Sequence, residues 1–241
     1  MSHNKFIFDV DGTLTPSRGQ IDLDFKAWFN NFCMMNDVYL VTGSNREKTV
    51  EQIGEDTYAL CKRVYNCSGS DVYEGTNNVR TSEWKPPEAL YELMNGWLNG
   101  SKFPVRTGNH MEERPGMINF SIVGRNCNAV QRLEYVEYDT ANRERETIAG
   151  IINRVFDDIT ATVGGETGID IHPTGADKSQ VLTDFSYYDT ITFYGDAMFD
   201  GGNDWSLAVA LVNSSYWKGK AVPVKDWRDT WEKLKEINNY E

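Results

Sequence analysis

Residues 5–15 read Lys-Phe-Ile-Phe-Asp-Val-Asp-Gly-Thr-Leu-Thr, and this stretch decides the fold that we expect. Residues 5–10 are apolar and β-prone until Asp11-Gly12 interrupts them, which is typical of a buried strand that ends in a turn. Because side chains alternate along a strand, Asp9 and Asp11 are expected to face one spot. Two carboxylates so close repel unless a cation or a shared proton offsets them, and Mg²⁺ prefers such oxygen ligands. Asp and Gly are also ordinary turn residues, so this motif alone would indicate only a turn.

Two later segments repeat the order of strand and polar turn. Residues 22–36 have helical spacing, and the apolar run 38–41 then stops at Thr42-Gly43-Ser44 before another helical stretch. A third apolar run, 190–194, stops at Gly195-Asp196. Alternating strands and helices favour a parallel sheet, and ligands of open α/β sheets bind beyond the carboxyl ends of the strands. We therefore expect the three turns to converge on one site.

The middle of the chain has a different pattern. A helical stretch runs from Pro86-Pro87 to about Leu98, residues 117–123 alternate like a half-buried strand, and residues 161–171 are β-like and interrupted by glycine. We therefore predict an α/β fold in which a Rossmann-like parallel-sheet core carries an inserted α+β cap domain over its carboxyl edge. The expected boundaries are 1–82 and 175–241 for the core and 83–174 for the cap.

Composition and charge narrow the function classes. With 241 residues, 40% of them hydrophobic, the chain can bury a core, and its longest apolar runs fall far short of the ~20 residues that a membrane span needs. The net charge of −12 argues against nucleic acid as a partner, because proteins that neutralise phosphates usually show a basic balance or stripe. The first residues lack the basic start and apolar stretch of a signal peptide, so we expect a cytoplasmic location and no membrane partner. The four cysteines form no Cys-x-x-Cys pair, which indicates reduced, structural thiols.

The whole string from Phe8 to Thr15 resembles the first motif of the haloacid dehalogenase superfamily. The other three motifs of that superfamily are matched in order by Val41-Thr42-Gly43, by Lys178, and by Gly195-Asp196 continuing to Asp204. Each motif falls at an expected strand or helix end. Four motifs in this order favour the superfamily over an isolated turn.

The resemblance assigns the roles that phosphoryl transfer needs. Asp9 would attack phosphorus and become transiently phosphorylated, while Asp11 would move a proton as general acid and base. Thr42, with Ser44 as the second choice, would hydrogen-bond the transferring phosphoryl group, and the Lys178 cation would balance its charge. The predicted catalytic residues are Asp9, Asp11, Thr42, Ser44 and Lys178. The predicted ligands of Mg²⁺, the expected cofactor, are Asp9, Asp11, Asp196, Asp200, Asn203 and Asp204.

The insertion narrows the resemblance to eukaryotic-type phosphomannomutases and extends it over nearly the whole chain. The matching segments are 113–119, 122–127, 131–134, 164–165, 173–178 and 201–204, together with Asp170. In that family, arginines of the cap bind the distal phosphate of a hexose phosphate. The matching substrate-binding residues are Arg114, Arg125 and Arg132, with Arg18 of the core assisting and Asp170 contacting the sugar. Arginine makes bidentate bonds to phosphate, although any single one of these side chains would more often be solvated surface charge.

The resemblance implies a mutase that interconverts mannose 6-phosphate and mannose 1-phosphate through an aspartyl-phosphate and a hexose bisphosphate intermediate. The alternative is a magnesium-dependent sugar-phosphate phosphatase of the same superfamily, in which water takes the phosphoryl group from Asp9. The family's serine two residues before the sugar-binding acid is Gly168 here, a departure that favours the phosphatase. A non-catalytic binding protein is a third hypothesis, against which the intact acids and Lys178 argue. Members of the family are often dimers through the cap, so the resemblance also implies a homodimer, although the sequence shows no interface.

Overall fold

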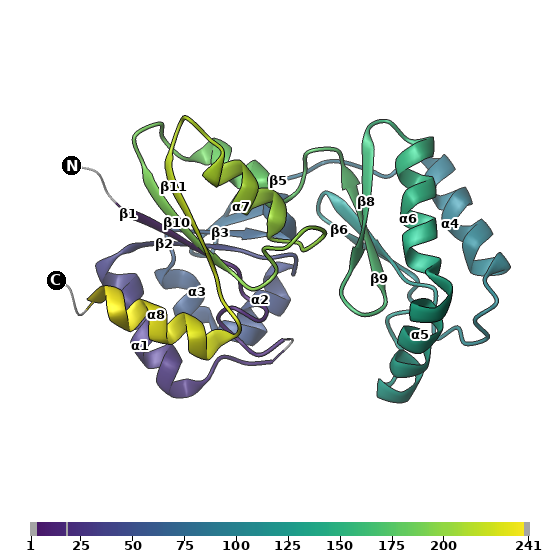
Figure 1. Cartoon of the computed structure of the whole chain (residues 1–241), viewed down its shortest axis with the longest axis horizontal. Helices are drawn as coiled ribbons and strands as arrows, with labels where there is room; N and C mark the ends of the chain where they lie inside the picture. Colours follow the sequence, from purple (N-terminus) through teal and green to yellow (C-terminus); the bar gives the residue numbers. More distant parts are fainter. Residues whose placement is uncertain (1–3, 18, 239–241) are drawn as a thin grey trace. The chain divides into compact units, whose positions relative to one another are not determined.

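The computed structural model describes residues 4–17 and 19–238, which form two compact units (Figure 1). Unit 1 contains the described residues up to Thr81 and those from Ala176 onward, and unit 2 contains Ser82–Gly175. The chain therefore leaves unit 1, builds unit 2 from one continuous segment, and returns to complete unit 1. Each unit has its own sheet and its own hydrophobic core.

Unit 1 is built on a seven-stranded sheet of order β11-β10-β1-β2-β3-β4-β5. The strands from β11 to β3 are parallel, and β4 and β5 join antiparallel at one edge. The strands are β1 (Asn4–Phe8), β2 (Asp37–Val41), β3 (Arg63–Asn66), β4 (Asp71–Glu74), β5 (Asn77–Thr81), β10 (Thr190–Gly195) and β11 (Lys218–Pro223). This arrangement confirms the expected α/β class with a parallel-sheet core.

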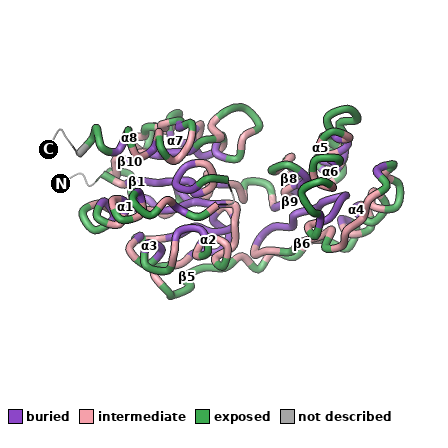
Figure 2. Tube along the Cα trace, turned by 90° about the horizontal axis from the view of Figure 1, so that it is seen from below, coloured by how far each residue is buried: buried purple, intermediate pink, exposed green. Residues whose placement is uncertain are grey.

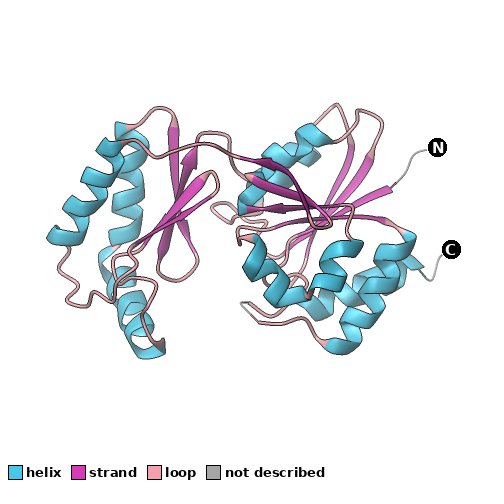
Figure 3. Cartoon of the chain, turned by 180° about the vertical axis from the view of Figure 1, so that it is seen from behind, coloured by secondary structure: helices cyan, strands magenta, loops and turns pink. Residues whose placement is uncertain are grey.

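Helices cover both faces of this sheet (Figure 3). They are α1 (Leu23–Met35), α2 (Arg46–Ile53), α3 (Glu55–Leu60), α7 (Trp205–Val212) and α8 (Trp227–Asn238), with the short 3₁₀ helices η1 (Cys67–Gly69) and η2 (Lys178–Asp184). Helix α1 begins after Asp22, whose carboxylate accepts hydrogen bonds from the N–H groups of Asp24 and Phe25 at 3.0 and 3.1 Å. Such a cap satisfies donors that have no partner within the helix, which explains the helix start expected from the sequence.

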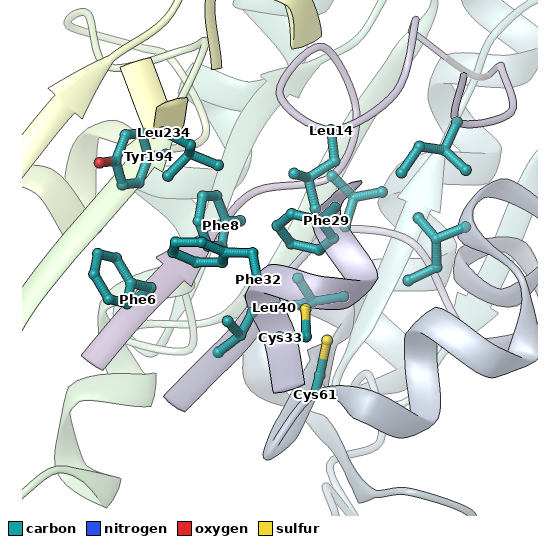
Figure 4. Packing of buried hydrophobic residues seen from close by; sticks show 14 of the residues in the cluster. Phe6, Phe8, Leu14, Phe29, Phe32, Cys33, Leu40, Cys61, Tyr194 and Leu234 are labelled. Carbon is teal, nitrogen blue, oxygen red and sulfur yellow. The ribbon is translucent and has the colours of Figure 1, made fainter. Parts of the chain in front are cut away.

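Strand alternation divides the core of unit 1 between the two faces of the sheet. Phe8 packs edge to face on Phe29 of α1, with ring centroids 5.3 Å apart (Figure 4). Ile7 points to the opposite face, where it joins the cluster that contains Leu207 of α7. Full burial of one such side chain stabilises the fold by ~1.5–3 kcal/mol. Strand β1 is therefore anchored on both faces immediately before Asp9.

Unit 2 is a four-stranded antiparallel sheet of order β6-β7-β9-β8 packed on helices α4, α5 and α6 (Figure 3). The elements are α4 (Glu88–Gly100), β6 (Met111–Arg114), β7 (Met117–Phe120), α5 (Ala129–Asn142), α6 (Glu144–Val155), β8 (Ile159–Gly164) and β9 (Gly168–Pro173). Ile118 and Ile171 are cross-strand partners in the cluster that also contains Ile148 of α6. Their neighbours Asn119 and Asp170 are partners as well and alternate to the other face of the sheet, which carries polar side chains.

Burial follows the two sheets, and their inner strands, such as β1 in unit 1 and β7 in unit 2, are the most buried (Figure 2). All four cysteines are buried, and the sulfur of Cys33, on α1, faces that of Cys61 (Figure 4). No helix in the described ranges combines the length and apolarity required for a membrane span.

Candidate active site

Asp9 lies directly after β1, at the carboxyl edge of the parallel strands. Its N–H donates to Tyr194 O of β10 at 2.9 Å, which extends the pairing of these strands by one residue. Its carboxylate is buried, and Oδ1 accepts a hydrogen bond from Lys178 Nζ at 2.5 Å. No side chain of the described residues donates to Asp9 Oδ2. The acid predicted to be the nucleophile thus has one oxygen fixed and one without a donor.

Lys178, the first residue of η2, binds two acids at once. Besides Asp9, its ammonium donates to Asp204 Oδ1 at 2.7 Å, and Asp204 Oδ2 accepts the N–H of Ala197 at 3.0 Å. Asp9, Asp196 and Asp204 each offer one carboxylate oxygen within 4.8 Å of the others. One ammonium does not neutralise three carboxylates, so a hard divalent cation suits this group of oxygens.

The pKa values in this group shift as expected for crowded charges, of which those of Asp9, Asp204 and Lys178 are buried while Asp196 is partly open to solvent. Burial raises the pKa of Asp9 well above its usual range, with Lys178 opposing the rise and Asp204 adding to it. Burial also raises the pKa of Asp196, and the charge of Asp204 adds to that shift. Burial alone would lower the pKa of Lys178, but the charges of Asp204 and Asp9 outweigh it and raise that pKa. A bound cation would relieve the same repulsion.

A tight turn follows Asp9. The N–H of Gly12 donates to Thr15 O at 2.9 Å, and the N–H of Thr15 donates to Val10 O at 3.1 Å. Gly12 has φ +79°, and a Cβ at this position would lie only 2.4 Å from Asp196 Oδ2. Glycine therefore serves two needs here, because it adopts positive φ without strain and lets the Asp196 carboxylate come close to the turn.

Asp11 lies within this turn. Gln52 of α2 donates from Nε2 to Asp11 Oδ1 at 2.8 Å, and Ser44 Oγ lies 3.5 Å from Asp11 Oδ2. The Asp11 carboxylate is absent from the three-carboxylate group found among the described residues. Strand β1 ends at Phe8, so strand alternation alone does not place Asp11 beside Asp9, and the expectation that the two acids face one spot stays a prediction. Gln52 was not identified as a site residue from the sequence. The one feature that distinguishes it is that this glutamine is buried within a helix.

The loop after β2 carries the two predicted hydroxyls. Thr42 is buried, and its Oγ1 accepts the N–H of Ser44 at 3.1 Å. The N–H of Cys67 donates to Ser44 O at 2.9 Å, and that of Ser68 donates to Thr42 O at 2.8 Å. Cys67, Ser68 and Gly69 all have positive φ, of 48°, 57° and 100°. Such a backbone costs ~1–2 kcal/mol per residue that has a Cβ, so these hydrogen bonds support a strained turn that holds the loop in place.

The remaining predicted residues of unit 1 are Asp200, Asn203 and Arg18. Asp200 and Asn203 are exposed, and Asp200 is not among the three grouped carboxylates of the described chain. Arg18 lies outside the described residues. The structure thus brings together Asp9, Asp196, Asp204 and Lys178, and the metal-binding role of all the predicted ligands stays a prediction.

Two of the three predicted cap arginines share one acid in unit 2. Glu112 Oε1 accepts from Arg114 Nε and Nη2 at 3.0 and 2.9 Å, and Glu112 Oε2 lies 2.9 Å from Arg125 Nε. Arg132 of α5 contacts Glu166 at 3.4 Å instead, and its buried Nε has no partner in the described structure. Glu112 was not identified from the sequence, although its position two residues before Arg114 on a strand places both on one face.

Asp170 is held on the polar face of the unit 2 sheet. Asn119 Nδ2 donates to its Oδ1 at 2.6 Å, and a Cβ at Gly164 would lie 2.3 Å from its Oδ2. A Cβ at Gly168 would lie 2.6 Å from Asn119 Nδ2, so the amide occupies the space beside this glycine. Glycine stands at position 168 in place of the family's serine, and the space beside it holds Asn119, which was not identified as a site residue from the sequence.

The architecture is that of the haloacid dehalogenase class. A haloacid dehalogenase-like hydrolase from Bacteroides thetaiotaomicron superposes with a TM-score of 0.62 at 11% identity, covering 98% of this chain and 100% of that chain. The C-terminal domain of C. albicans trehalose-6-phosphate phosphatase gives a TM-score of 0.68 at 12% identity, covering 100% and 94%. At such identities the likeness concerns the fold alone.

Sequence similarity identifies the family. Residues 25–239 match the family described as eukaryotic phosphomannomutase. The phosphomannomutase of Schizosaccharomyces pombe is 32% identical over 246 residues, covering 97% of this chain and 93% of that protein. That of Spinacia oleracea is 31% identical over 209 residues, covering 83% and 84%. The chain belongs to the eukaryotic phosphomannomutase family, which confirms the resemblance seen in its motifs.

Proposed function

We propose that this chain is a phosphomannomutase that interconverts mannose 6-phosphate and mannose 1-phosphate. Family membership supports the reaction, and the observation that carries the proposal is the state of Asp9. Lys178 binds Asp9 Oδ1, and Asp9 Oδ2 has no donor among the described residues. A carboxylate becomes a competent nucleophile for a phosphoryl group when nearby cations neutralise the phosphate oxygens that it approaches.

The proposed chemistry has two half-reactions at the same acid. Asp9 Oδ2 forms a bond to phosphorus of a hexose bisphosphate while the bond between phosphorus and the sugar oxygen breaks. Asp11 gives its proton to that oxygen and later takes a proton from the hydroxyl that attacks the phosphoaspartate. The hydrogen bond from Gln52 Nε2 to Asp11 Oδ1 at 2.8 Å supports this role, because it fixes the direction of the proton-carrying group.

We propose Mg²⁺ as the cofactor, held by Asp9 and Asp196 with Asp204 beside them. The grouping of these three carboxylate oxygens within 4.8 Å, with a single lysine to balance them, supports this. When bound, Mg²⁺ would neutralise phosphate oxygens and help orient the transferring group. Lys178 supports the same end, because its hydrogen bonds fix Asp9 Oδ1 and Asp204 Oδ1 and its charge partly balances both acids.

Unit 2 is proposed to be the cap that binds the phosphate not undergoing transfer, with boundaries close to 83–174. The pairing of Arg114 with Arg125 supports an anion site, since guanidinium groups bind phosphate in bidentate fashion. Arg132 and Arg18 would assist, and Asp170, whose carboxylate is fixed by Asn119, would contact the sugar. A dimer through unit 2 is part of the same proposal.

One assay tests the function. The protein is incubated with Mg²⁺ and mannose 1-phosphate, with and without a hexose bisphosphate, and both sugar phosphates and free phosphate are measured. A mutase gives mannose 6-phosphate that depends on the bisphosphate. Release of free phosphate without isomerisation would instead identify a phosphatase.

The nucleophile is tested by Asp9→Asn. This variant is expected to lose all turnover, because the amide cannot form the phosphoaspartate, while it still unfolds in a cooperative thermal transition. Asp24→Asn, a change of the same kind at an exposed position of α1, serves as the control and should retain full activity. Residual activity in purified Asp9→Asn above the background of an empty preparation would exclude Asp9 as the nucleophile.

A further inference from the structure

Glu112 links two arginines that come from different segments of unit 2. It lies on β6 with Arg114 two residues on, so both side chains leave the same face of the strand. Arg125 follows β7 in a loop that returns to the segment before β6, where its N–H donates to Asn109 O at 3.1 Å. Gly124 has φ +89°, and a Cβ there would lie 2.3 Å from a backbone oxygen of that segment. The close approach of the two loops brings the Arg125 guanidinium to Glu112.

Both oxygens of the Glu112 carboxylate are used, each by a different arginine. Oε1 lies 3.0 and 2.9 Å from Nε and Nη2 of Arg114, and Oε2 lies 2.9 Å from Nε of Arg125. The three side chains are 28%, 15% and 27% exposed, so the group is largely shielded from water. Two guanidinium groups held this close repel each other, and the carboxylate between them removes that repulsion.

We infer that Glu112 is a positioning residue, which fixes Arg114 and Arg125 as a pair that binds the non-reacting phosphate of the sugar substrate. The inference rests on the proposed function. Glu112 contacts Arg125 through Nε, and no acceptor among the described residues bonds to Nη1 or Nη2 of Arg125. A guanidinium donates along more than one edge, so holding Nε leaves the outer edge of Arg125 directed at an incoming anion.

The opposite role would be competition, with Glu112 occupying the place of the phosphate until substrate displaces it. The two roles predict opposite signs. If Glu112 positions the arginines, its replacement weakens binding of the sugar phosphate, whereas a competitor's replacement would strengthen binding. The contact at Arg125 Nε, rather than at the bidentate outer edge, favours positioning.

Glu112→Gln is the informative variant, because glutamine keeps the shape but offers one acceptor oxygen and places an NH₂ group toward the other guanidinium. The control is Glu113→Gln, the same change one residue along β6, where Glu113 accepts a hydrogen bond from Tyr91 Oη at 2.6 Å instead. Steady-state kinetics with mannose 1-phosphate give KM and kcat. Calorimetric titration of mannose 1-phosphate into the same variants carrying Asp9→Asn gives the dissociation constant without turnover.

Loss of one charge-assisted hydrogen bond is expected to raise both KM and the dissociation constant of Glu112→Gln about tenfold or more, with kcat within about twofold of the parent. Glu113→Gln should match the parent. In an Arg125→Gln background the further effect of Glu112→Gln should shrink, because Glu112 then has one arginine left to position. Glu112→Asp, which keeps both oxygens, should recover part of the binding and provides the measurement if Glu112→Gln does not fold.

Equal or tighter binding by Glu112→Gln would overturn the positioning role. Binding that weakens equally in Glu112→Gln and Glu113→Gln would overturn it as well. Either result leaves the proposed function intact. A parent protein that neither binds nor converts mannose 1-phosphate would overturn the proposed function and this inference with it. Normal turnover by the parent separates the two cases.

Discussion

Replacing Lys178 with methionine should destabilise the protein far more than any exposed lysine replacement. Lys178 is 1% exposed, and its ammonium lies 2.5 Å from Asp9 Oδ1 and 2.7 Å from Asp204 Oδ1, both of them buried. Removing one partner of a buried ion pair costs about 3–5 kcal/mol, because the remaining charge is left without compensation. Here two carboxylates lose their partner together, so we expect a loss of roughly 3–5 kcal/mol in the free energy of unfolding at pH 7.

Lys26→Met is the matched control. Lys26 Nζ lies 2.6 Å from Asp56 Oδ1, a distance similar to those at Lys178, but the two side chains are 22% and 60% exposed. An exposed pair of this kind contributes only about 0–1 kcal/mol. Urea unfolding of both variants, followed by tryptophan fluorescence, measures the difference. A Lys178→Met variant within about 1 kcal/mol of Lys26→Met would refute the view that Lys178 compensates buried charge.

The deficit of Lys178→Met should also shrink at lower pH. Burial already raises the pKa of Asp9 in the folded protein, and loss of Lys178 removes an effect that lowers it. Between the unfolded and the folded pKa the folded state binds more protons than the unfolded state, so stability rises as pH falls. We therefore expect the variant to approach the parent between pH 7 and pH 5. A deficit that stays constant over this range would mean that packing, not charge, causes the loss.

Two further changes test the geometry of unit 1. Gly12→Ala should place its Cβ against Asp196 and strain a backbone at φ +79°. We therefore expect the half-saturating Mg²⁺ concentration to rise about tenfold in titrations of activity. An unchanged concentration would show that the position of Asp196 does not depend on the turn. Asp184→Asn breaks the paired contacts of 3.0 and 3.1 Å with Arg80 and should cost about 1 kcal/mol at pH 7 in urea unfolding. Burial is the largest single effect and would raise the pKa of Asp184, but the hydrogen bonds and charge of Arg80, together with Tyr65 and the charge of Arg63, outweigh it and lower that pKa. The stabilisation by Asp184 is therefore present above pH ~4 and is lost as pH falls through the folded pKa. The difference between Asp184→Asn and the parent should therefore vanish at low pH, and a pH-independent difference would contradict the assignment.

Short-range patterns predicted the parts of the fold that depend on neighbouring residues. The apolar run before Asp9 became β1, the run 190–194 lies within β10, and the two pair in parallel. Local spacing also predicted the helix that begins after Asp22. These features follow from alternation, helical periodicity and capping, all of which are written in contiguous stretches of chain.

The parts that the sequence did not predict depend on residues far apart in the chain. Gln52, which binds Asp11, is separated from it by 41 positions, and Asn119, which binds Asp170, by 51. Neither a glutamine nor an asparagine indicates a functional site unless the acid that it binds is known. The surroundings of Asp11 depend on the turn as well, since backbone hydrogen bonds within residues 10–15 replace strand pairing there.

The discontinuity of unit 1 has a consequence for the order in which the chain folds during synthesis. Strand β1 lies between β10 and β2 in the sheet. Asn4 of β1 pairs with Thr190 of β10, so one of the two neighbours of β1 is synthesised 186 residues later. Every strand of unit 2 lies between Met111 and Pro173 and pairs only within that range. Local pairings form before pairings that must close a long loop, and domains generally fold as units as they emerge. Unit 2 is therefore expected to be complete while β1, although already beside β2, still lacks β10 on its other edge, and this open edge is the one that a chaperone would need to protect from mispairing in the nascent chain.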